Sequence, residues 1–382
     1  MSTAAVTGPL RGIRVVHLAS LGPGPYAAML LADLGCAVTI IDRTREMAVS
    51  VPQGQDPRRR GQRSIALDLK LPQARAVALQ LIGQSDVLIE GMRPGAIERL
   101  GLGPEACLQR NPRLVYARVT GWGQSGPLAQ RAGHDINYIA LSGALHAMGS
   151  AADPPPVPLN LLGDYAGGGA FVAMGVMAAL FERERSGQGQ VVDGAIADGV
   201  ASLSAATMGM LACGRWGPRG TNIFDGAAPW YRTYRTAEGG FVAVGAIEPE
   251  FYGQLLSGLG LEAAQWPQQD RERWPAMAER FARIFGSQPR SHWERIFAET
   301  DACVSPVLSF EEAAAHPHHR SRNTYIEVAG VVQPAPAPRL SRSGSSRPEQ
   351  PPAPGSHTDE ILRECGLGAA EITQLRACGA AA

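Results

Sequence analysis

The sequence predicts an α/β protein with two parts: a Rossmann-like large domain built on a parallel sheet, and a smaller α+β domain. The first observation is length, because 382 residues exceed one typical domain. The second is that short apolar runs alternate with helical patterns over residues 1–123, which is typical of a parallel sheet covered on both faces. The third is a change of composition after Cys213, where a Gly-rich loop precedes a hairpin pattern.

The front of the chain reads as a series of β-α-β units. "IRVVHLA" is a compact β-rich run, which the loop "SLGPGP" and the helical pattern "YAAMLLADLG" follow, and "CAVTIID" is the next strand. The alternation continues with a helical pattern at 73–83 and strands at 86–91 and 113–123. We therefore expect a doubly wound sheet.

The longest helix candidate covers residues 163–190. It has an acidic start at Asp164, charged residues in its last turn and glycines just past its end. A short strand and another helix follow over residues 191–211. We place the first part of the large domain at residues 1–200, and a linker helix and loop at 201–225.

Residues 226–318 read as the small α+β domain. A hairpin is predicted at 231–246, followed by several helical patterns and a strand in "ACVSPVLSF". Residues 319–382 form the C-terminal segment. From Pro334 to Ser356 this segment is rich in Pro and Ser and is expected to run extended over the surface. Two short helices end the chain.

Composition narrows the classes of partner. The formal net charge is zero, which argues against nucleic acid or an anionic membrane as the main partner, because both attract basic proteins. The six cysteines show no metal-like spacing, so we expect free thiols in a reducing compartment. The N-terminus lacks the plan of a secretory signal, and the apolar run Phe171–Phe181 is shorter than the roughly 20 residues that span a bilayer. We expect a soluble, cytoplasmic protein that is not in a membrane.

Two other patterns suggest sites but have simpler interpretations. Residues 22–27, "GPGPYA", fit the dinucleotide-binding pattern G-x-G-x-x-A. Both prolines weaken that interpretation, because each removes an N–H that a pyrophosphate cradle would use. Pro25 fits the first helical position, so a tight β-α turn is favoured over nicotinamide or flavin binding. The histidines of "HPHHR" (316–320) read as surface residues rather than a metal site, and His146 is expected to face the core.

The stretch "GHDINY" (133–138) sets His134 beside Asp135 where an apolar-periodic segment begins. Asp135 in a first turn complements the helix dipole and reads as a capping residue. A histidine at a helix N-terminus feels a positive potential, which disfavours imidazolium and leaves a ring able to accept a proton. Asp164 begins the long helix thirty residues later. The residues alone leave two alternatives for His134 and Asp164: an acid–base pair, or two helix caps.

Three glycines, Gly167–Gly169, follow Asp164. Each is costly in a helix relative to alanine, so the run predicts that something approaches this backbone closely. Helix N–H groups aimed into a site can also stabilise an oxyanion.

The chain as a whole resembles a known protein family. It is similar to the family III CoA transferases, and within them to the α-methylacyl-CoA racemases, over nearly its whole length. The likeness is carried by several motifs in the right order: "GPLRGIRVVHLASLGPGPYAAMLLADLGCAVTIIDR", "SDVLIEGMRPGAIERLGLGP", "RLVYARVTGWGQSGPLAQRAGHDINYIALSG", "PLNLLGDYAGGGAFVAMGVMAALFER", "GAIEPEFY" and "SHTDEIL". The resemblance implies that residues 319–382 complete the large domain, and that two chains interlock into a homodimer with active sites between subunits. It also implies an acyl-CoA thioester substrate, with no metal and no cofactor beyond the CoA of the substrate.

The resemblance also assigns site residues. His134 and Asp164 match the two catalytic bases of the racemases, and Glu248 in "AIEP" matches the acid that orients the histidine. CoA contacts are implied at two single arginines and three segments: Arg43 and Arg99; Leu67, Asp68, Leu69 and Lys70; Gly91, Met92 and Arg93; Gly133, Asp135 and Tyr138. Arginines suit the CoA phosphates because their hydrogen bonds are charge-assisted.

The chemistry of racemisation agrees with these residue types. Removing the α-proton of a 2-methylacyl thioester from one face and returning a proton to the other needs two carriers, neutral His134 with protonated Asp164 or the proton-swapped pair. The oxygen of the enolate intermediate is expected on a backbone N–H near Asp164, where the glycines let the thioester approach. One alternative is a CoA transferase, in which Asp164 is a nucleophile and His134 has no essential role. A second is a non-catalytic acyl-CoA-binding protein, against which the intact pair counts.

Overall fold

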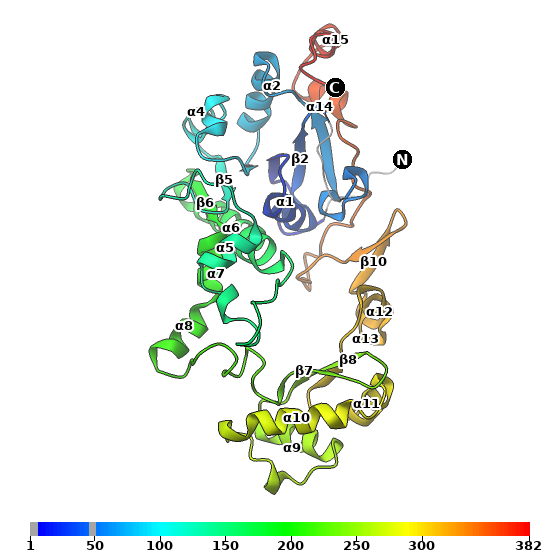
Figure 1. Cartoon of the computed structure of the whole chain (residues 1–382). Coiled ribbons are helices and arrows are strands. Elements are labelled where there is room, and N and C mark those ends of the chain that lie inside the picture. The colour runs from blue at the N-terminus through cyan, green and yellow to red at the C-terminus, as the bar shows by residue number, and fades with distance from the viewer. Residues whose placement is uncertain (1–6, 46–50) are drawn as a thin grey trace. The chain divides into compact units, whose positions relative to one another are not determined.

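The computed structural model describes residues 7–45 and 51–382, and the chain divides into two compact units (Figure 1). The first unit combines Met1–Ser142, Pro158–Leu203 and Arg320–Ala382. The second combines Gly143–Val157 and Ser204–His319. Residues 143–157 thus group with the second unit rather than with the first part of the large domain. Residues 204–225 also group with it instead of standing apart as a linker. Residues 1–6 belong to the N-terminal stretch in which the sequence predicts no secretory signal, and they lie outside the described residues.

The first unit is built on a six-stranded parallel sheet. Its strand order is β3-β2-β1-β4-β5-β6, the doubly wound arrangement that the sequence predicts. The strands, with their bounds, are β1 (Arg14–Leu18), β2 (Ala37–Asp42), β3 (Gln62–Ala66), β4 (Val87–Glu90), β5 (Val115–Thr120) and β6 (Val191–Ala195).

Strand β3 is not among the strands predicted from the apolar pattern. Its sequence, "QRSIA", begins with three polar residues, two of which are buried. The interior tolerates them because they have partners: Ser64 donates its hydroxyl to Oδ2 of Asp42 at 2.6 Å, and Gln62 donates to the carbonyl of Arg58 at 2.7 Å. A buried strand that carries hydrogen-bonded polar side chains does not show the apolar run that predicts the other strands of this sheet.

Helices cover both faces of the sheet. The helices of the first unit, with their bounds, are α1 (Pro23–Asp33), α2 (Pro72–Gly83), α3 (Ala96–Arg99), α4 (Pro104–Arg110), α5 (Asp135–Leu141), the π-helix η4 (Leu161–Ala170), α6 (Phe171–Ser186), α7 (Ile196–Leu203), α14 (Thr358–Glu364) and α15 (Ala369–Ala377). One hydrophobic cluster joins α2 to the two C-terminal helices, and a second joins α1 to α6. Two apolar layers on one sheet give the doubly wound architecture.

The C-terminal segment returns to the N-terminal strands. Figure 1 shows α14 and α15, in red, beside the blue elements of the same unit. The N–H of His357 donates to the carbonyl of Ser64 at 2.9 Å, and the N–H of Asp68 donates to the carbonyl of Ala380 at 3.0 Å. The preceding hairpin of β10 (Tyr325–Val328) and β11 (Val331–Pro334) is antiparallel, and the sequence pattern does not predict it.

Residues 161–186 form a single helical segment that starts as a π-helix. It begins two residues before the predicted start at 163, and it ends at Ser186, where Gly187 takes a φ of 73°. By length and composition, this 26-residue helix is long and apolar enough to cross a membrane. The length of the run Phe171–Phe181 therefore does not settle the question. In this structure, Val172 and Val176 of the helix are fully buried in the core of the first unit.

The second unit contains a three-stranded antiparallel sheet of β7 (Tyr231–Arg235), β8 (Phe241–Gly245) and β9 (Val304–Pro306). The hairpin of β7 and β8 is the one that the sequence predicts. The helices of the second unit are α8 (Ala205–Ala212), α9 (Pro249–Gly258), α10 (Trp274–Phe285), α11 (Arg290–Phe297) and α12 (Phe310–Ala315). Helix α13 (Pro317–Arg322) spans the boundary at which this unit ends. The core of the unit is rich in aromatic residues, with Trp230, Phe281 and Phe285 fully buried.

Candidate active site

Most of the sequence-predicted site residues lie at one edge of the parallel sheet. Arg43 follows β2, Leu67–Lys70 follow β3, and Gly91–Arg93 follow β4. The carboxyl ends of parallel strands meet at one edge, and strand order reverses here between β1 and β4, which is where doubly wound folds bind ligands. The loops after these two strands touch, because a Cβ on Gly91 would lie 3.3 Å from Cβ of Ser20.

His134 occupies the N-cap of α5, with an extended backbone and an exposed side chain. Its N–H donates to Oδ1 of Asn137 at 3.0 Å, and its carbonyl accepts from the N–H of Asn137 at 2.8 Å. Both backbone groups are therefore engaged with the first turn of α5. The imidazole is left accessible at the helix start, as proton transfer to a substrate requires.

The sequence suggests that Asp135 caps its own helix, but in the structure its carboxylate binds another element. It is the first residue of α5, it is buried, and its Oδ2 accepts the backbone N–H of Asp164 at 2.6 Å. Asp135 Oδ2 also packs against the Cα of Gly163, because a side chain at Gly163 would overlap it. The residue beside His134 thus binds the backbone that carries Asp164, and it joins the two predicted proton carriers through one hydrogen bond.

Asp164 lies in the first half of the π-helix, and its side chain is half-buried. Asn160 donates to its Oδ2 at 3.3 Å. Burial raises the pKa of Asp164; the hydrogen bond from Asn160 lowers it, the Asp135 carboxylate raises it, and the positive charges of His134 and Arg58 lower it, with a net pKa above the usual aspartate range. A carboxyl group with a raised pKa is suited to carrying a proton between turnovers.

Asn160 is a contact of Asp164 that the sequence analysis does not name. Its signal is the spacing Asn160 to Asp164, since amide and carboxylate groups four residues apart meet on one helix face. The π-helix around Asp164 also lacks a sequence signal. Such wide turns occur frequently at functional sites.

The "GPGP" turn packs against the side chain of Asp164. Gly22 has a φ of 67°, and a Cβ there would lie 2.9 Å from Oδ2 of Asp164. Glycine is required on both counts, because an L-residue would be strained and its Cβ would displace the carboxylate. The prediction for Pro25 is wrong by two positions: α1 begins at Pro23, and Pro25 is its third residue.

The three glycines after Asp164 face protein rather than a ligand. A Cβ on Gly167 would lie 2.6 Å from a methyl of Val200 on α7, and one on Gly168 would lie 2.8 Å from Cβ of Pro23 on α1. A Cβ on Gly169 would likewise lie 2.8 Å from the carbonyl oxygen of Pro23. The expectation that something approaches this backbone closely is correct, but the partners are two neighbouring helices. The N–H of Asp164 itself is also occupied by Asp135, so it is not the donor for an enolate oxygen.

The implied CoA contacts divide by exposure. Four cationic side chains at the sheet edge are exposed: Arg43, Lys70, Arg93 and Arg99. Asp68, Leu69 and Met92 are partly exposed, and Gly91 is exposed. Leu67 and Tyr138 are buried, so their side chains serve the interior. Leu67 lies in a core cluster. The Tyr138 ring packs against Trp122 with centroids 4.7 Å apart, and the Tyr138 hydroxyl donates to the carbonyl of Gly133.

A buried ion pair supports the loop after β4, and the sequence analysis does not identify it. Oε2 of Glu90 accepts the N–H of Met92 at 2.7 Å, and Nε of Arg118 donates to Oε1 of Glu90 at 2.8 Å. Burial raises the pKa of Glu90, which is fully buried, and these hydrogen bonds oppose the rise. The loop that carries Arg93 is thereby fixed to β4 and β5.

Glu248 belongs to the second unit. It follows β8, is exposed, and is the N-cap of α9. Burial raises the pKa of the neighbouring Cys303 thiol, and the negative charge of Glu248 raises it further.

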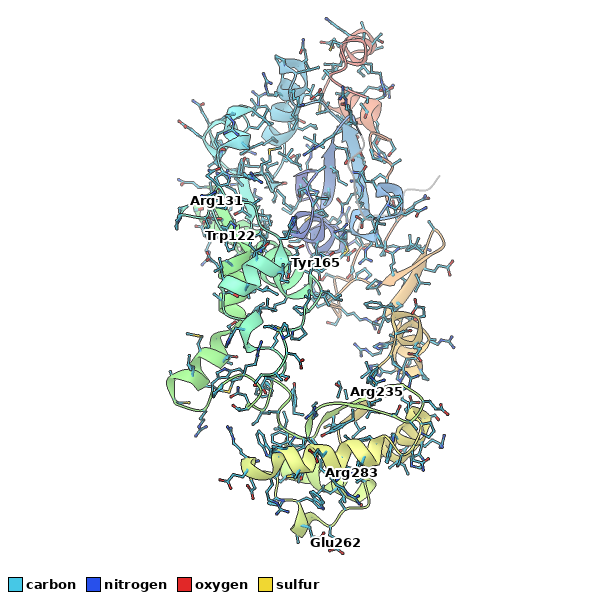
Figure 2. The ribbon with its side chains drawn as sticks, in the orientation of Figure 1. Trp122, Arg131, Tyr165, Arg235, Glu262 and Arg283 are labelled. Carbon is cyan, nitrogen blue, oxygen red and sulfur yellow. The ribbon has the colours of Figure 1, made fainter. Side chains whose placement is uncertain are left out.

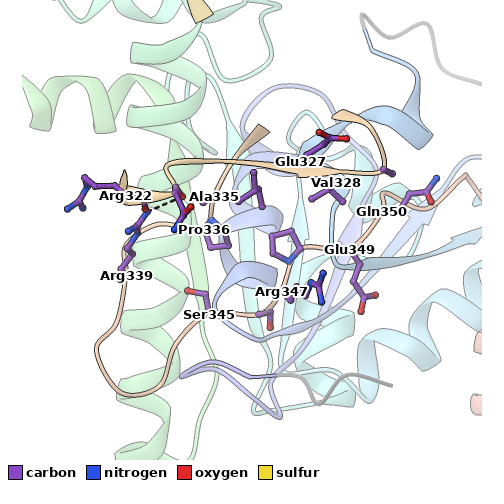
Figure 3. A pocket seen from close by; sticks show the side chains of 15 residues that line it. Arg322, Glu327, Val328, Ala335, Pro336, Arg339, Ser345, Arg347, Glu349 and Gln350 are labelled. Atoms are coloured by element: carbon purple, nitrogen blue, oxygen red, sulfur yellow. Dashed lines mark hydrogen bonds between the residues drawn. The ribbon is translucent and has the colours of Figure 1, made fainter. Parts of the chain in front are cut away.

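Two cavities lie in the described part of the first unit. One of about 860 Å³ opens between the β10–β11 hairpin and the extended segment after it, and arginines 322, 339 and 347 line it (Figure 3). The other, of about 20 Å³, is lined by His17, Ser20 and Arg58 among others and is large enough for one water molecule. Within residues 7–45 and 51–382, no group of three or more His, Cys, Asp or Glu side chains is arranged to hold a metal ion. His146 is exposed rather than in the core.

Comparison with known proteins identifies relatives over nearly the whole chain. A profile of CoA-transferase family III matches residues 10–358. The α-methylacyl-CoA racemases of Mus musculus and Homo sapiens are 48% and 47% identical to the chain over 370 residues, 96% of this chain and 96% of each relative. The acetyl-CoA:oxalate CoA-transferase of Acetobacter aceti is 32% identical and covers 91% of this chain and 92% of its own length. The structure of Rv3272 from M. tuberculosis aligns with a TM-score of 0.78 and 26% identity over 93% of this chain and 99% of its own.

Proposed function

This chain belongs to CoA-transferase family III, and we infer that it is a racemase that interconverts (2R)- and (2S)-2-methylacyl-CoA thioesters. One observation carries this conclusion: the full-length identity of 47–48% to two α-methylacyl-CoA racemases, against 32% to a CoA-transferase. The site supports it, since an accessible histidine and a carboxyl group of raised pKa belong to elements that one hydrogen bond joins.

We propose that His134 and Asp164 are the two proton carriers. In one direction the base takes the C2 proton and leaves an enolate, and the other carrier, already protonated, returns a proton to the opposite face of C2. After turnover the proton has moved from one carrier to the other, so the pair holds one proton before and after the reaction. The raised pKa of Asp164 favours such sharing, because it brings a carboxyl group closer to an imidazole in proton affinity.

Asp135 has a supporting role in this proposal. Its carboxylate accepts the N–H of Asp164 and raises the pKa of Asp164. It therefore fixes the position of the carrier and disfavours the ionised form at once. We add Glu248 as the acid that orients His134, on the basis of the family resemblance. The exposed arginines at the sheet edge are the proposed partners of the CoA phosphates. No cofactor beyond the CoA of the substrate enters the proposal, since both proton carriers are side chains.

We also propose a homodimer, the state that the resemblance implies. Exposed apolar side chains support this proposal. Helix α8 of the second unit has no buried residue, and Met208 and Leu211 on it are 60% and 53% exposed. A large contiguous patch of exposed apolar side chains marks an interaction surface, and we propose that these two contribute to one. Sedimentation velocity is the direct measurement of the number of chains.

Proton exchange with solvent tests the proposed function. A single stereoisomer of a 2-methylacyl-CoA, incubated with the protein in deuterated water, should acquire deuterium at C2 and lose optical purity. Mass spectrometry and chiral analysis of the released acid measure the two changes. Retention of protium at C2 together with optical purity would rule out racemisation.

The His134→Ala variant separates the racemase from the transferase. It should lower the exchange rate by 10²-fold or more, because general acid–base catalysis contributes about 10²–10⁴-fold. His146→Ala, which removes an exposed histidine of the second unit, is the matched control and should leave exchange unchanged. Hydroxylamine should not inactivate the protein in the presence of substrate. Inactivation would indicate a covalent adduct on Asp164 and support the transferase mechanism.

A further inference from the structure

Arg58 lies on the 3₁₀ turn η2 (Pro57–Arg59), where a single carboxylate holds it. Asp56, the N-cap of this turn, is buried, and its Oδ1 accepts the N–H of Arg58 at 3.0 Å and the Nε of Arg58 at 2.9 Å. Its Oδ2 accepts Nη2 at 2.7 Å. Backbone and guanidinium of Arg58 are thus bound to one group, which restricts the orientation of the side chain.

The remaining guanidinium nitrogen points to the π-helix. Nη1 of Arg58 donates to the hydroxyl of Tyr165 at 3.4 Å. Tyr165 (labelled in Figure 2) directly follows Asp164, and its ring packs against Tyr26 of α1 with centroids 4.9 Å apart. The clamped arginine therefore contacts the segment that carries Asp164 from an element that the catalytic proposal does not use.

Titratable groups lie on several elements that pack against the π-helix of Asp164. Helix α5 contributes His134, Asp135 and Tyr138, the π-helix contributes Tyr165, α1 contributes Tyr26, and α7, which packs along the glycine end, carries Asp198. Asp135 favours the protonated form of Asp164, while His134 and Arg58 favour the ionised form. The charge of His134 changes during the reaction. The charge of Arg58 is permanent, because a guanidinium stays protonated at any working pH.

We propose that Arg58 is a positioning residue that holds the Asp164 segment through Tyr165. As the pH falls, it also keeps the His134–Asp164 pair in its active state, in which the two carriers hold one proton between them. A doubly protonated pair contains no base and cannot take the C2 proton. Without the fixed positive charge, burial and Asp135 would be opposed only by the Asn160 hydrogen bond and by His134, and the doubly protonated form would accumulate at higher pH. This inference deepens the proposed function and rests on it.

The pH dependence of kcat/KM for deuterium incorporation tests the proposal. Arg58→Gln should move the acid limb of the profile upward by about half a pH unit, since loss of a nearby cation raises a carboxyl pKa. Below the limb this is about a threefold loss of rate. The alkaline limb should stay in place. A purely structural role for Arg58 would lower the rate at every pH and leave the acid limb where it is, and this outcome would overturn the proposal.

Two further variants keep the test decisive. Arg63→Gln is the matched control: it removes an arginine from the same stretch, but Arg63 pairs with Glu360 and Glu364, so the acid limb should not move. Arg58→Lys retains the positive charge but loses the paired guanidinium hydrogen bonds to Asp56. Its acid limb should lie at the wild-type pH, and its kcat should be lower. If Arg58→Gln does not fold, a moved limb in Arg58→Lys contradicts the proposal. Absence of exchange in the wild-type protein would instead refute the racemase function itself.

Discussion

His17 shows how burial alone sets the chemistry of a single residue. It lies on β1, its ring is fully enclosed, and its Nε2 is 3.2 Å from the hydroxyl of Ser20. Burial lowers the pKa of His17 from 6.5 to about 4, and Asp42, which raises the pKa, only partly opposes this effect. The folded protein therefore holds a neutral ring at neutral pH, whereas the unfolded chain begins to protonate it near pH 6.5.

The free energy of unfolding should consequently depend on pH through His17. Because its folded pKa is depressed, its stabilising contribution is complete above about pH 6.5 and is lost as the pH falls towards about 4. The loss is on the order of 3 kcal/mol. Urea titrations at pH 7 and pH 4.5 should show it in the wild type. His17→Asn should show a smaller difference between the two pH values, and His146→Asn, at an exposed site, should behave as wild type. Equal differences in all three proteins would disprove this assignment.

At the scale of elements, glycines set how closely the π-helix approaches its neighbours. Gly167, Gly168 and Gly169 contact α7 and α1 through bare backbone. The contact is reciprocal, because a side chain on Gly199 of α7 would overlap the carbonyl oxygen of Gly167. Two helices that meet through glycine on both sides leave no room for a methyl group, and the same packing places Asp164 against Gly22.

Gly199→Ala should therefore destabilise the protein and weaken catalysis together. The added Cβ must move α7 or the π-helix, at a cost of roughly 3 kcal/mol in the free energy of unfolding. Movement of the π-helix displaces Asp164, so deuterium incorporation should fall as well. Gly253→Ala on α9 is the control, because nothing lies within 4 Å of its Cβ, and alanine should stabilise that helix by up to about 1 kcal/mol. Comparable stability of the two variants in urea titrations would contradict the packing argument.

At the scale of the whole molecule, the two ends of the sequence share one core. Leu362 and Ile361 of α14 are buried in the same cluster as Leu67, Val77 and Leu81. The chain leaves the first unit for the second after Leu203 and returns to it at Arg320. The first unit is therefore complete only when the last sixty residues or so have folded back onto its first strands.

Leu362→Ala should lower the free energy of unfolding by about 2–5 kcal/mol, the usual cost of a cavity at a fully buried leucine. The transition followed by far-ultraviolet circular dichroism measures it. Leu340→Ala lies on the same return segment at an exposed site and should change the free energy by less than about 0.5 kcal/mol. A similar small effect in both variants would mean that the return segment is not part of the core.

Much of the fold follows from local patterns. The strands β1, β2, β4 and β5, the β7–β8 hairpin and the two C-terminal helices lie where apolar runs, turn residues and caps predict them. β3 escapes prediction because its sequence begins with three polar residues, and the apolar runs do not predict the β10–β11 hairpin either. The polar groups of β3 are tolerated only because Asp42 and Arg58 are there to bond them.

The site divides in the same way. His134 at a helix start and Asp164 before a glycine run have signals of their own, in residue type and in position. Asp135, Asn160, Gly22 and Arg58 acquire their roles only from neighbours. Of these, Asn160 alone has a helical spacing to Asp164, and the others lie on different elements.

The sequence by itself determined the alternation of strands and helices, the two candidate proton carriers and the membership of a family. Those properties depend on residues close together in the chain, or on motifs kept in order. Only the tertiary structure decided that the glycines meet other helices and that Asp135 binds the backbone of Asp164. The tertiary structure alone also determined that Arg58, held by Asp56, contacts the hydroxyl of Tyr165. Each of these contacts joins elements far apart in sequence at separations of a few ångströms, and no local periodicity encodes which backbone will lie against which.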